Sequence, residues 1–484
     1  MTSKWKWALF SVAGIILSWM IAFAIWQQAQ RPVSITELLL FGALIPVLAG
    51  TGIWMLGRHL SNSASTPTDT SVTSFDTTSP NPAKAMPETT QQQPIYILDS
   101  SLICLGGRDL DGVRDHAQQH PLPDLDPELT DEDGYPIRSY RADVDIPPNL
   151  ATPPNQSDQD HHEARTARMR ALLGQALESL QDTTAALAAQ ATASSPSNPS
   201  SSPQSAQMHP GWHGTTVTDT LSTPQSSPSI SISIRLFLGT ANLSAATPLL
   251  SDIRNWLGTF PGGEHCEVKL TQCDHAGHLP QDLATFANRA STESHGQVMI
   301  ALAAHSDLDQ TIIESWQQKG WLGGRQGGKV PGEVACGLIF ANHKDCVPEQ
   351  VASAQFDSIQ SLVRQKPANA SGRIDTLEMA NLLRSTNTVS PFSATTDQQV
   401  WVDSEALSSG AAELGQWWLE SFPDTPDTQL IRLGSAWGPC GTAGQLALMV
   451  ATAQATAASA QPQLAVMAAD PIYRSMCLMR PVAA

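Results

Sequence analysis

The stretch Gly434-Ser-Ala-Trp-Gly-Pro-Cys-Gly-Thr-Ala-Gly444 decides the fold, because it joins a short apolar strand to a long apolar helix. The predicted strand is Leu430 to Leu433, and the helix begins with Gln445-Leu-Ala-Leu-Met-Val450. Glycines at such a junction let backbone segments pass close together and leave several N–H groups directed into one shared space. This geometry suits either a catalytic site that holds an acyl group or tight helix packing.

The length, net charge and cysteine content of the chain limit its possible domain organisation, binding partners and cellular compartment. The 484-residue chain carries a formal net charge of -18, and its length allows two ordinary domains or one large domain with tails. Because neutralising phosphates requires clustered Lys and Arg, this acidic balance excludes nucleic acid as the expected partner. The seven cysteines include no C-x-x-C pair, and an odd, unpatterned count favours a reducing compartment.

Two uncharged apolar segments lie near the amino terminus, at residues 7–26 and 38–56. Each is long enough to cross a hydrocarbon core of roughly 30 Å as a helix. A cleaved signal peptide is the alternative for the first segment, but its length and its bulky tryptophans favour a retained span. Lysines before the first segment and Arg58 after the second place both ends in the cytoplasm by the positive-inside rule. We therefore expect a transmembrane hairpin over residues 1–60.

Two later segments, residues 61–93 and 194–229, are rich in Ser, Thr and Pro and lack an apolar period. Such segments cannot bury a core, so we predict a flexible linker and a disordered insertion, respectively. Lengthening a surface loop costs little entropy, and the fold therefore tolerates the insertion.

Apolar strands alternate with amphipathic helices from residue 230 onward, which predicts a layered α/β sheet. Upstream of this region, a strand and turn are expected over residues 95–107. The expected strands are 230–238, 264–270, 298–303, 338–341, 400–402, 430–433 and a final one at 463–468, and the expected helices are 248–257, 279–290, 377–383, 411–421 and one after the glycine turn.

Two charged segments come before that region. Leu122 to Tyr140 is rich in acids but lacks the glycine and terminal glutamate of an EF-hand, so a solvated loop is predicted rather than a calcium site. His161 to Ala191 has a leucine stripe at helical spacing and is predicted to be one helix. Arg165, Arg168 and Arg170 are expected to form its solvated face.

Three segments, in this order, resemble motifs of the thiolase-fold condensing enzymes, the ketoacyl synthases among them. Val298 to Asp307 resembles a strand that ends in a Gly-x-Asp-Ser-like turn. Gly332-Glu-Val-Ala-Cys-Gly337 resembles the Gly-Glu-Gly-Ala-Gly entry to a central hairpin, and Gly434 to Gly444 resembles a Gly-His-x-x-Gly-Ala-x-Gly turn. The resemblance implies a thiolase-like layered α/β fold of two pseudo-repeated halves, residues 94–345 and 346–484.

Condensing enzymes of that family use a cysteine thiolate at a helix amino terminus, with two histidines, or a histidine and an asparagine, that stabilise the oxyanion and assist decarboxylation. The resemblance places the cysteine on Asp274 and the two histidines on Glu405 and Ser435. Carboxylates would repel a developing oxyanion. We therefore expect a protein that is not an enzyme and that has no cofactor.

Two cysteines remain as fallback nucleophiles. A shift of one residue would bring Cys273 into the catalytic position, with His275 or His278 beside it. Cys440 lies within the glycine turn, but no histidine is near it in sequence, and small-residue packing explains it more simply.

Other interpretations of the same side chains are possible. A zinc site is one alternative, but Cys-x6-Cys-x-His-x2-His is not an established spacing, so separate side chains and no metal are expected; the residues concerned are His265, Cys266, Cys273, His275 and His278. Tryptophans often anchor partners, but the usual burial of Trp favours core or half-buried helix positions for Trp417-Trp418 and for Trp316 and Trp321.

The arrangement of a two-span anchor, a long linker and a thiolase-like scaffold without its catalytic trio is similar to that of the type VI secretion lipase adaptor proteins of Gram-negative bacteria. The resemblance implies an inner-membrane adaptor, facing the cytoplasm, that binds a phospholipase effector and helps load it onto the secretion spike. The thiolase-like resemblance also leaves open a homodimer, formed through a strand of the first half.

A membrane-bound acyl-condensing or acyltransferase enzyme of the ketoacyl synthase superfamily is the alternative. Acyl carrier proteins, its expected partners, are acidic, and the acidic charge of this chain weighs against that pairing. A structural subunit of an envelope complex is a third possibility.

Overall fold

The structure, a computed structural model, describes residues 94–482 except 120–121, 147–157, 195–229, 291–295, 324–327, 347–351, 369–373, 396 and 405–408. The predicted membrane segments and the linker lie outside the described residues, as does the insertion from residue 195 onward. Among the helices of the described part, none is both long enough and apolar enough to span a bilayer.

Five strands form the first half of a single ten-stranded sheet, in the spatial order β5-β4-β6-β7-β1. Strand β4 lies between β5 and β6 and runs parallel to both, whereas β7 runs antiparallel to both β6 and β1. Every residue of β7 is buried, as expected for a strand covered on both faces. The strands are β1 (Ile95–Ile103), β4 (Ile230–Gly239), β5 (Glu267–Cys273), β6 (Gly296–Ser306) and β7 (Glu333–Ala341).

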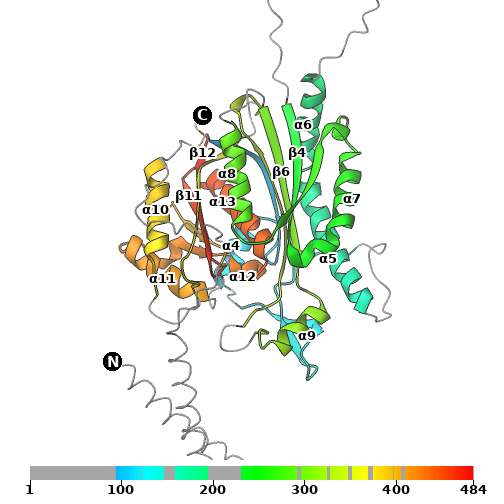
Figure 1. The fold of residues 1–484 in the computed structure, drawn as a ribbon, viewed down its shortest axis with the longest axis vertical. Helices are drawn as coiled ribbons and strands as arrows, with labels where there is room; N and C mark the ends of the chain where they lie inside the picture. Colours follow the sequence, from blue (N-terminus) through cyan, green and yellow to red (C-terminus); the bar gives the residue numbers. More distant parts are fainter. Residues whose placement is uncertain are drawn as a thin grey trace, which may run out of the picture. The chain divides into compact units, whose positions relative to one another are not determined.

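The other five strands repeat this arrangement in the order β10-β9-β11-β12-β8, with the same pattern of parallel and antiparallel neighbours. Antiparallel pairing of β1 with β8 joins the two groups (Figure 1). The predicted α/β alternation is therefore confirmed. The strands are β8 (Ala354–Val363), β9 (Val400–Val402), β10 (Leu430–Arg432), β11 (Gln463–Met467) and β12 (Tyr473–Pro481).

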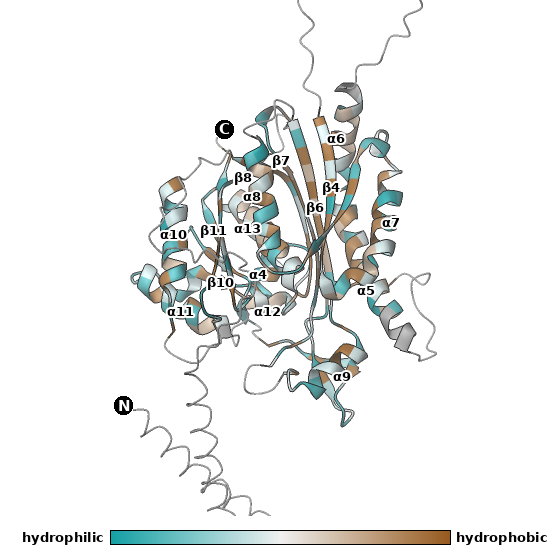
Figure 2. Cartoon of the chain, viewed as in Figure 1, coloured by the Kyte–Doolittle hydropathy of each residue, from teal (hydrophilic) through white to brown (hydrophobic). Residues whose placement is uncertain are grey.

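Helices divide the molecule into layers (Figure 1). Helices α8 and α13 lie in the middle, and their apolar residues share one core with strands of both halves. Helices α5 and α7 cover the outer face of the first half, where β6 is apolar along most of its length (Figure 2). Helices α10 and α11 cover the second half. The bounds are α5 (Asp158–Ser179), α7 (Ala246–Leu257), α8 (His278–Ala290), α10 (Leu377–Val389), α11 (Ser409–Ser421) and α13 (Gly441–Ser459).

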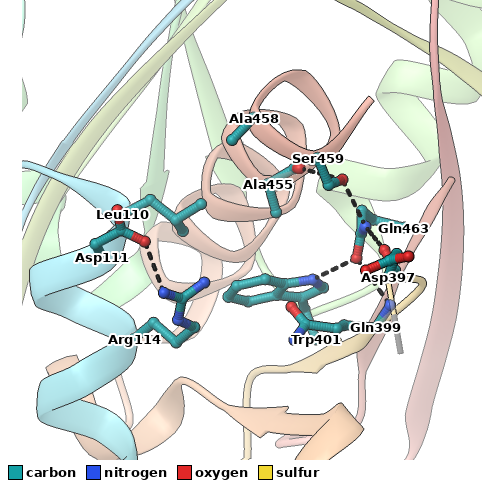
Figure 3. Close-up of a pocket in the computed structure, with 10 residues that line it drawn as sticks. All are labelled: Leu110, Asp111, Arg114, Asp397, Gln399, Trp401, Ala455, Ala458, Ser459 and Gln463. Atoms are coloured by element: carbon teal, nitrogen blue, oxygen red, sulfur yellow. Dashed lines mark hydrogen bonds and ion pairs between the residues drawn. The ribbon is translucent and has the colours of Figure 1, made fainter. Parts of the chain in front are cut away.

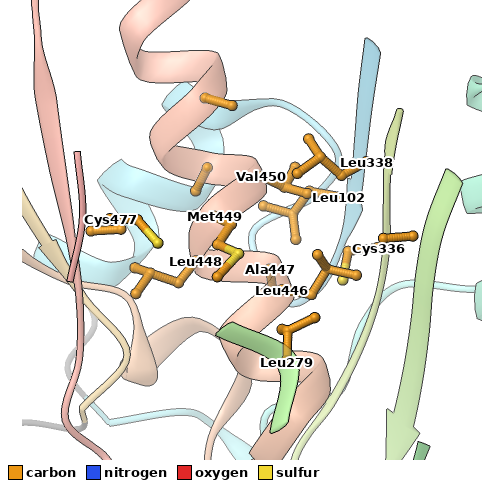
Figure 4. Close-up of a cluster of buried hydrophobic side chains, with 14 of the residues drawn as sticks. Leu102, Leu279, Cys336, Leu338, Leu446, Ala447, Leu448, Met449, Val450 and Cys477 are labelled. Atoms are coloured by element: carbon orange, nitrogen blue, oxygen red, sulfur yellow. The ribbon is translucent and has the colours of Figure 1, made fainter. Parts of the chain in front are cut away.

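Helix α13 is apolar on all sides, which is typical of a helix that is buried on all sides. Figure 4 shows its leucines and Met449 between Leu102 and Leu338 of the first half and Cys477 of the second. The glycine turn that precedes it contains the short helix α12 (Gly434–Trp437). The sheet therefore closes around α13, and the two halves share this core.

Three expectations about local structure were wrong. The single helix expected over residues 161–191 is broken at Leu180 into α5 and α6 (Gln181–Ser194). The expected solvated loop contains β2 (Leu125–Thr130) and β3 (Pro136–Arg138), because Asp126 is buried and bound by Ser139 and Arg141. The expected final strand is followed by β12. Elements missing from the prediction are α4 (Leu110–Gln119), β8, α9 (Gln310–Gln318) and β12.

The arginines of α5 do not form a solvated face. Arg165 is buried and donates to the Ser306 carbonyl at 2.6 Å. Arg168 pairs with Glu333, and Arg170 pairs with Asp252 at 2.6 Å. The expectation was wrong because the acceptors lie far along the chain, on β6, β7 and α7.

Candidate functional site

The amino ends of the central helices α8 and α13 meet in the middle of the molecule, and this is where the sequence placed a catalytic site. Strand β5 leads into α8 and ends at Cys273. Strand β10 leads through the glycine turn into α13, and Thr442 lies in the first turn of that helix. The Thr442 hydroxyl donates a hydrogen bond to Cys273 Sγ, which joins the two helix ends directly.

Cys273 is buried in this junction, with only 4% of its surface exposed. Burial raises the pKa of its thiol to about 11, although the hydrogen bond from Thr442 acts in the opposite direction. The negative charges of Asp282 and Asp274 raise the pKa of the thiol further. Because the thiolate is the nucleophile, a thiol held in its protonated form is poorly suited to acyl transfer.

The residues that follow Cys273 form a tight turn held by histidines. The backbone N–H of Asp274 donates to His278 Nδ1 at 3.1 Å, and the N–H of Gly277 donates to His275 Nδ1 at 3.1 Å. Each neutral imidazole therefore carries its proton on Nε2. The His275 ring stacks on Tyr473 at 4.4 Å between ring centroids. These contacts tie the start of α8 to the start of β12.

Two further residues that the sequence singled out, Ser435 and Cys440, bind backbone carbonyl groups. The Ser435 hydroxyl is buried and donates to the carbonyls of Ala117 and Arg432, at 3.2 and 2.9 Å. Cys440 is buried, and its thiol donates to the Trp437 carbonyl at 2.8 Å. Glu405 lies outside the described residues.

Asp403, two residues before Glu405, is the carboxylate that the structure describes at this end of β9. It accepts hydrogen bonds from the backbone N–H groups of Ala468 and Ala469, at 2.7 and 2.9 Å. Burial raises its pKa to about 6, although these hydrogen bonds and the charge of Arg474 favour the ionised form. Asp403 therefore lies just after the carboxyl end of β9, and Cys273 lies at the carboxyl end of β5; both side chains are buried and ionisable.

Four backbone N–H groups of the glycine turn form hydrogen bonds within the turn itself. The backbone N–H groups of Ala436, Gly438, Cys440 and Gly444 all donate to carbonyl oxygens within Leu433–Gly444 or its short helix, so none of these four is left free for a ligand. The expectation of N–H groups directed into a shared space is wrong for them. Each of these N–H groups is satisfied by a carbonyl oxygen that lies only two to four residues earlier in the chain.

Close backbone approach explains why glycines recur in the two resembling motifs. A Cβ atom on Gly332 would lie 2.0 Å from the Trp437 carbonyl oxygen, so the start of β7 and the glycine turn touch backbone to backbone. Gly438 has a φ of +71°, a conformation that favours glycine. Glu333, beside Gly332, is fully buried and accepts hydrogen bonds from Arg168 and from the Ala142 N–H. This motif therefore holds α5 and β7 together.

The sequence matches no known protein-family model and no curated protein. The structure, however, is similar to solved ketosynthases. One is the ketosynthase from module 6 of the bacillaene synthase of Bacillus subtilis 168, with a TM-score of 0.50 and 12% identity over 81% of this chain and 72% of that chain. Another is the ketosynthase of a type II polyketide synthase in complex with its acyl-carrier protein, with a TM-score of 0.50 and 11% identity over 81% of this chain and all of that chain.

The chain has a mixed α/β thiolase-like fold. At these identities the similarity concerns the fold alone, and a shared fold does not determine function. Within the thiolase-like fold of this chain, the structure brings together Cys273 and Thr442, and His275 and Tyr473, at the amino ends of the central helices.

The structure also shows where the possible zinc ligands and the tryptophans lie. The described residues contain no cluster of three or more His, Cys, Asp or Glu side chains that could hold a metal ion. Trp417 and Trp418 are buried in the core of the second half, as the usual burial of tryptophan favoured. Trp316 is half-buried in α9, as expected. Trp321 lies beyond the end of that helix and is 47% exposed, which differs from the expectation; Lys319 and Lys329 lie over its ring.

Sequence reasoning missed a pocket at the carboxyl end of α13, with a volume of about 270 Å³ (Figure 3). Its residues come from α4, the approach to β9, the last turns of α13 and the start of β11. No local motif could have revealed it, because α4, the segment around β9 and the end of α13 are distant in sequence and meet only in the folded chain.

Proposed function

We propose that this protein uses its thiolase-like fold to bind another protein and does not catalyse acyl condensation. The observation that carries the proposal is the state of Cys273, whose pKa is raised to about 11 by burial. A thiol that is held in its protonated form at neutral pH is a poor nucleophile, because the thiolate is the reactive species. The stacking of His275 on Tyr473 supports a structural role for the neighbouring imidazole.

We propose further that the partner is a type VI secretion phospholipase effector, which the protein would hold at the cytoplasmic face of the inner membrane and help load onto the secretion spike. This finer proposal is supported by the sequence arrangement alone: two apolar segments, a long linker and a condensing-enzyme scaffold whose expected catalytic residues are replaced. The acidic net charge of -18 is compatible with a protein partner and disfavours nucleic acid.

The second candidate is a membrane-bound acyl-condensing or acyltransferase enzyme of the ketoacyl synthase superfamily. The similarity to solved ketosynthases favours this candidate over the adaptor. In this case Cys273 would be the nucleophile, attacking the carbonyl of an acyl thioester and expelling the carrier thiol. Deprotonation of the buried thiol would have to accompany acyl binding.

A covalent-adduct experiment separates the two candidates. Full-length protein in mild detergent is incubated with an isotope-labelled acyl thioester, and adducts are located by mass spectrometry of its peptides. We expect no adduct on Cys273 or Cys440, while an active ketosynthase treated in parallel becomes labelled. An adduct on Cys273 that disappears in the Cys273→Ala variant would overturn the non-catalytic proposal. Cys440→Ala serves as the matched variant for the second thiol.

A binding experiment tests the adaptor itself. Purified full-length protein is mixed with a phospholipase and a spike protein whose genes lie next to its own, and complex formation is followed by size-exclusion chromatography with mass determination. We expect a stable complex with the phospholipase, even without the spike. If neither protein binds at micromolar concentration, the adaptor proposal is wrong, whatever the result of the adduct experiment.

A further inference from the structure

A small lobe, formed by α9 and the β2–β3 hairpin, projects beyond the end of the large sheet (Figure 1). It comprises residues 122–140 and the described residues of 307–331, and it has a core of its own around Leu129 and Ile313. Nine large apolar side chains are exposed in the described part of the chain, and four of them lie in this lobe: Leu122, Leu125, Tyr135 and Trp321. Because the lobe is a small part of the structure, this excess indicates a contact surface.

The end of α9 fixes the position of Trp321 in the lobe. Gly320 has a φ of +64°, and its N–H donates to the Gln317 carbonyl at 2.8 Å. The N–H of Trp321 donates to the Trp316 carbonyl at 2.7 Å. These two bonds form a Schellman motif, which ends a helix in one defined conformation. Trp321 is nevertheless 47% exposed, so its indole ring is presented to solvent on a backbone that is already ordered.

Two lysine side chains lie against this exposed ring. Lys319 Nζ is 5.0 Å and Lys329 Nζ 4.9 Å from the centroid of the Trp321 ring, which is within the range of cation–π contact. Both lysines are exposed, and within the described residues neither forms a salt bridge. An ammonium group has three N–H donors, so donors remain for oxygen atoms outside the ring. We call Trp321, Lys319 and Lys329 the Trp321 cluster.

The acidic turn of the lobe lies at the other end of α9. Gln310, the first residue of this helix, accepts from the Thr130 N–H at 3.2 Å and donates to the Thr130 carbonyl at 3.0 Å. The acids 131–133 directly follow Thr130. At 1.5 Å per residue, α9 separates this turn from Lys319 by roughly 14 Å, which exceeds the screening length of about 8 Å at physiological salt. Two lysines therefore face one nearby acid, the exposed Glu314 of α9, and the cluster is locally positive.

The small size of the Trp321 cluster favours a bilayer over a protein as its partner. Three side chains are too few for a stable protein–protein interface, which takes about 20 to 30 residues from each partner. At a bilayer surface, by contrast, an indole ring lies at the level of the headgroups, and each lysine strengthens association with anionic lipids roughly fivefold. Such a weak contact becomes effective in a tethered protein, because the tether raises the effective concentration of the second contact.

We propose that the Trp321 cluster contacts the headgroup region of a bilayer that contains anionic lipids. The indole ring lies among the headgroups, and the ammonium groups of Lys319 and Lys329 donate to lipid phosphates. This proposal rests on the proposed anchoring of the chain in the inner membrane, and it adds a second contact that holds the carboxyl end of α9 against the same membrane.

Fluorine NMR of the full-length protein in lipid nanodiscs tests the contact. Protein labelled with 5-fluorotryptophan is placed in discs of phosphatidylcholine with or without phosphatidylglycerol, each with a trace of lipid that carries a gadolinium chelate on its headgroup. Trp321→Phe assigns the Trp321 signal, and discs with a diamagnetic lutetium chelate give the reference line width. We expect gadolinium to broaden this signal at least about fivefold more in the anionic discs. Equal broadening in both kinds of disc, or none in the anionic discs, would overturn the proposal.

A double variant assigns the charged contacts. Lys319→Gln combined with Lys329→Gln should reduce the broadening in anionic discs at least about tenfold, because both contacts with phosphate are lost. Lys344→Gln combined with Lys366→Gln is the matched control, since it removes the same charge from exposed positions outside the lobe. Melting curves establish that each variant folds. Equal reductions in the two double variants would show a general effect of net charge and reject this site.

The same experiment separates this contact from the anchoring on which it rests. Protein that does not co-elute with discs of either composition overturns the proposed anchoring and this contact with it. Protein that co-elutes with the discs but shows no broadening of the Trp321 signal overturns the contact alone. If Trp321→Ala then also loses the complex with the phospholipase, the surface belongs to a protein partner and the bilayer proposal is wrong.

Discussion

Asp403 is a residue at which ionisation and folding oppose each other. It is buried beside β9 and β11, and burial raises its pKa from 3.8 to about 6. Two backbone N–H groups and the charge of Arg474 stabilise its carboxylate, but they do not offset the loss of water. Such a carboxylate retains its proton in the native state at a pH at which the unfolded chain has already released it.

The pH dependence of stability follows from this difference. Between about pH 4 and pH 6 the native state binds one proton more than the unfolded state at Asp403, so the free energy of unfolding falls as the pH rises through this window. The loss is about 3 kcal/mol at about 1.4 kcal/mol per pKa unit. We expect Asp403→Asn to lack this loss. Urea unfolding at pH 4 and pH 7 measures the difference for both proteins.

The control for this prediction is Asp424→Asn, which changes an exposed carboxylate. It should leave the pH dependence of the wild type unchanged, since an exposed group titrates similarly in both states. If the wild type and Asp403→Asn lose equal stability between pH 4 and pH 7, Asp403 is ionised in the native state throughout, and the prediction is wrong.

The sequence predicted where candidate side chains lie along the chain but not what surrounds them. The prediction that Cys273 lies just before a helix is correct, because the strand and helix periods are local. Its burial, and the hydrogen bond from Thr442, depend on a segment more than 160 positions away. The Ser435 hydroxyl likewise binds the Ala117 carbonyl of α4, a helix that the sequence pattern did not predict. Such contacts have no local signal.

At the scale of elements, the start of β7 packs backbone to backbone against the glycine turn, and a substitution at Gly332 tests how much this contact contributes to stability. Gly332→Ala would place a Cβ atom 2.0 Å from the Trp437 carbonyl oxygen, so one of the two segments must shift. We expect a loss of about 2 to 4 kcal/mol in the free energy of unfolding, as for other overpacked sites where backbone must move. Urea unfolding at pH 7 measures the change.

Gly415→Ala is the matched control. Gly415 lies in the interior of α11, where an added Cβ atom would meet no other atom within 4 Å. Because alanine favours a helix over glycine, this variant should gain up to about 1 kcal/mol. If both variants change stability by the same amount and in the same direction, backbone contact at Gly332 is not the cause.

Strand β5 forms one end of the described sheet, and its side chains are largely exposed. An unpaired strand edge is a template for pairing with another chain. The homodimer through the first half therefore remains a prediction. In it, Leu270, which is 39% exposed, would become buried.

Leu270→Asp tests this arrangement. Burying a charge without a partner is unfavourable, so we expect the variant to weaken dimerisation at least about tenfold, measured by sedimentation equilibrium of the full-length protein. Leu419→Asp, on the exposed face of α11, is the control and should leave the association constant unchanged. A monomeric wild type, or a Leu270→Asp variant that dimerises normally, would contradict the prediction.

Elements differed in how well their sequences revealed them. Strands β6 and β9 were predicted well because they are apolar runs bounded by turn residues. Strand β12 was missed because it begins with Tyr473 and Arg474. The Arg474 side chain is fully buried against Glu413 at 2.7 Å. In a sequence, a charged residue indicates an exposed position unless its buried partner can be identified. The partner here, Glu413, lies on α11, about 60 positions earlier in the sequence.

At the scale of the whole molecule, the repeated strand order explains why two groups of elements form a single structure. Each group contributes one face to the central layer of α8 and α13. Pairing of β1 with β8 then makes the sheet continuous. Periodicity alone could predict the alternation of strands and helices, but the shared central layer depends on contacts between halves that are far apart in sequence.

The sharing of α13 predicts that the second half cannot fold alone. On the side facing the first half, α13 packs against Leu338 and Leu102, and the thiol of Cys336 donates to the Ala443 carbonyl at 3.6 Å (Figure 4). Without that half, an apolar helix side would face water, and an isolated helix of this length is marginal. A fragment of residues 352–484 should therefore give no near-ultraviolet circular dichroism and no cooperative urea transition. Adding a separately produced fragment of residues 94–351 should restore both signals through noncovalent assembly. A cooperative transition in the isolated second half would show instead that its outer core, around Trp417 and Trp418, is sufficient for folding.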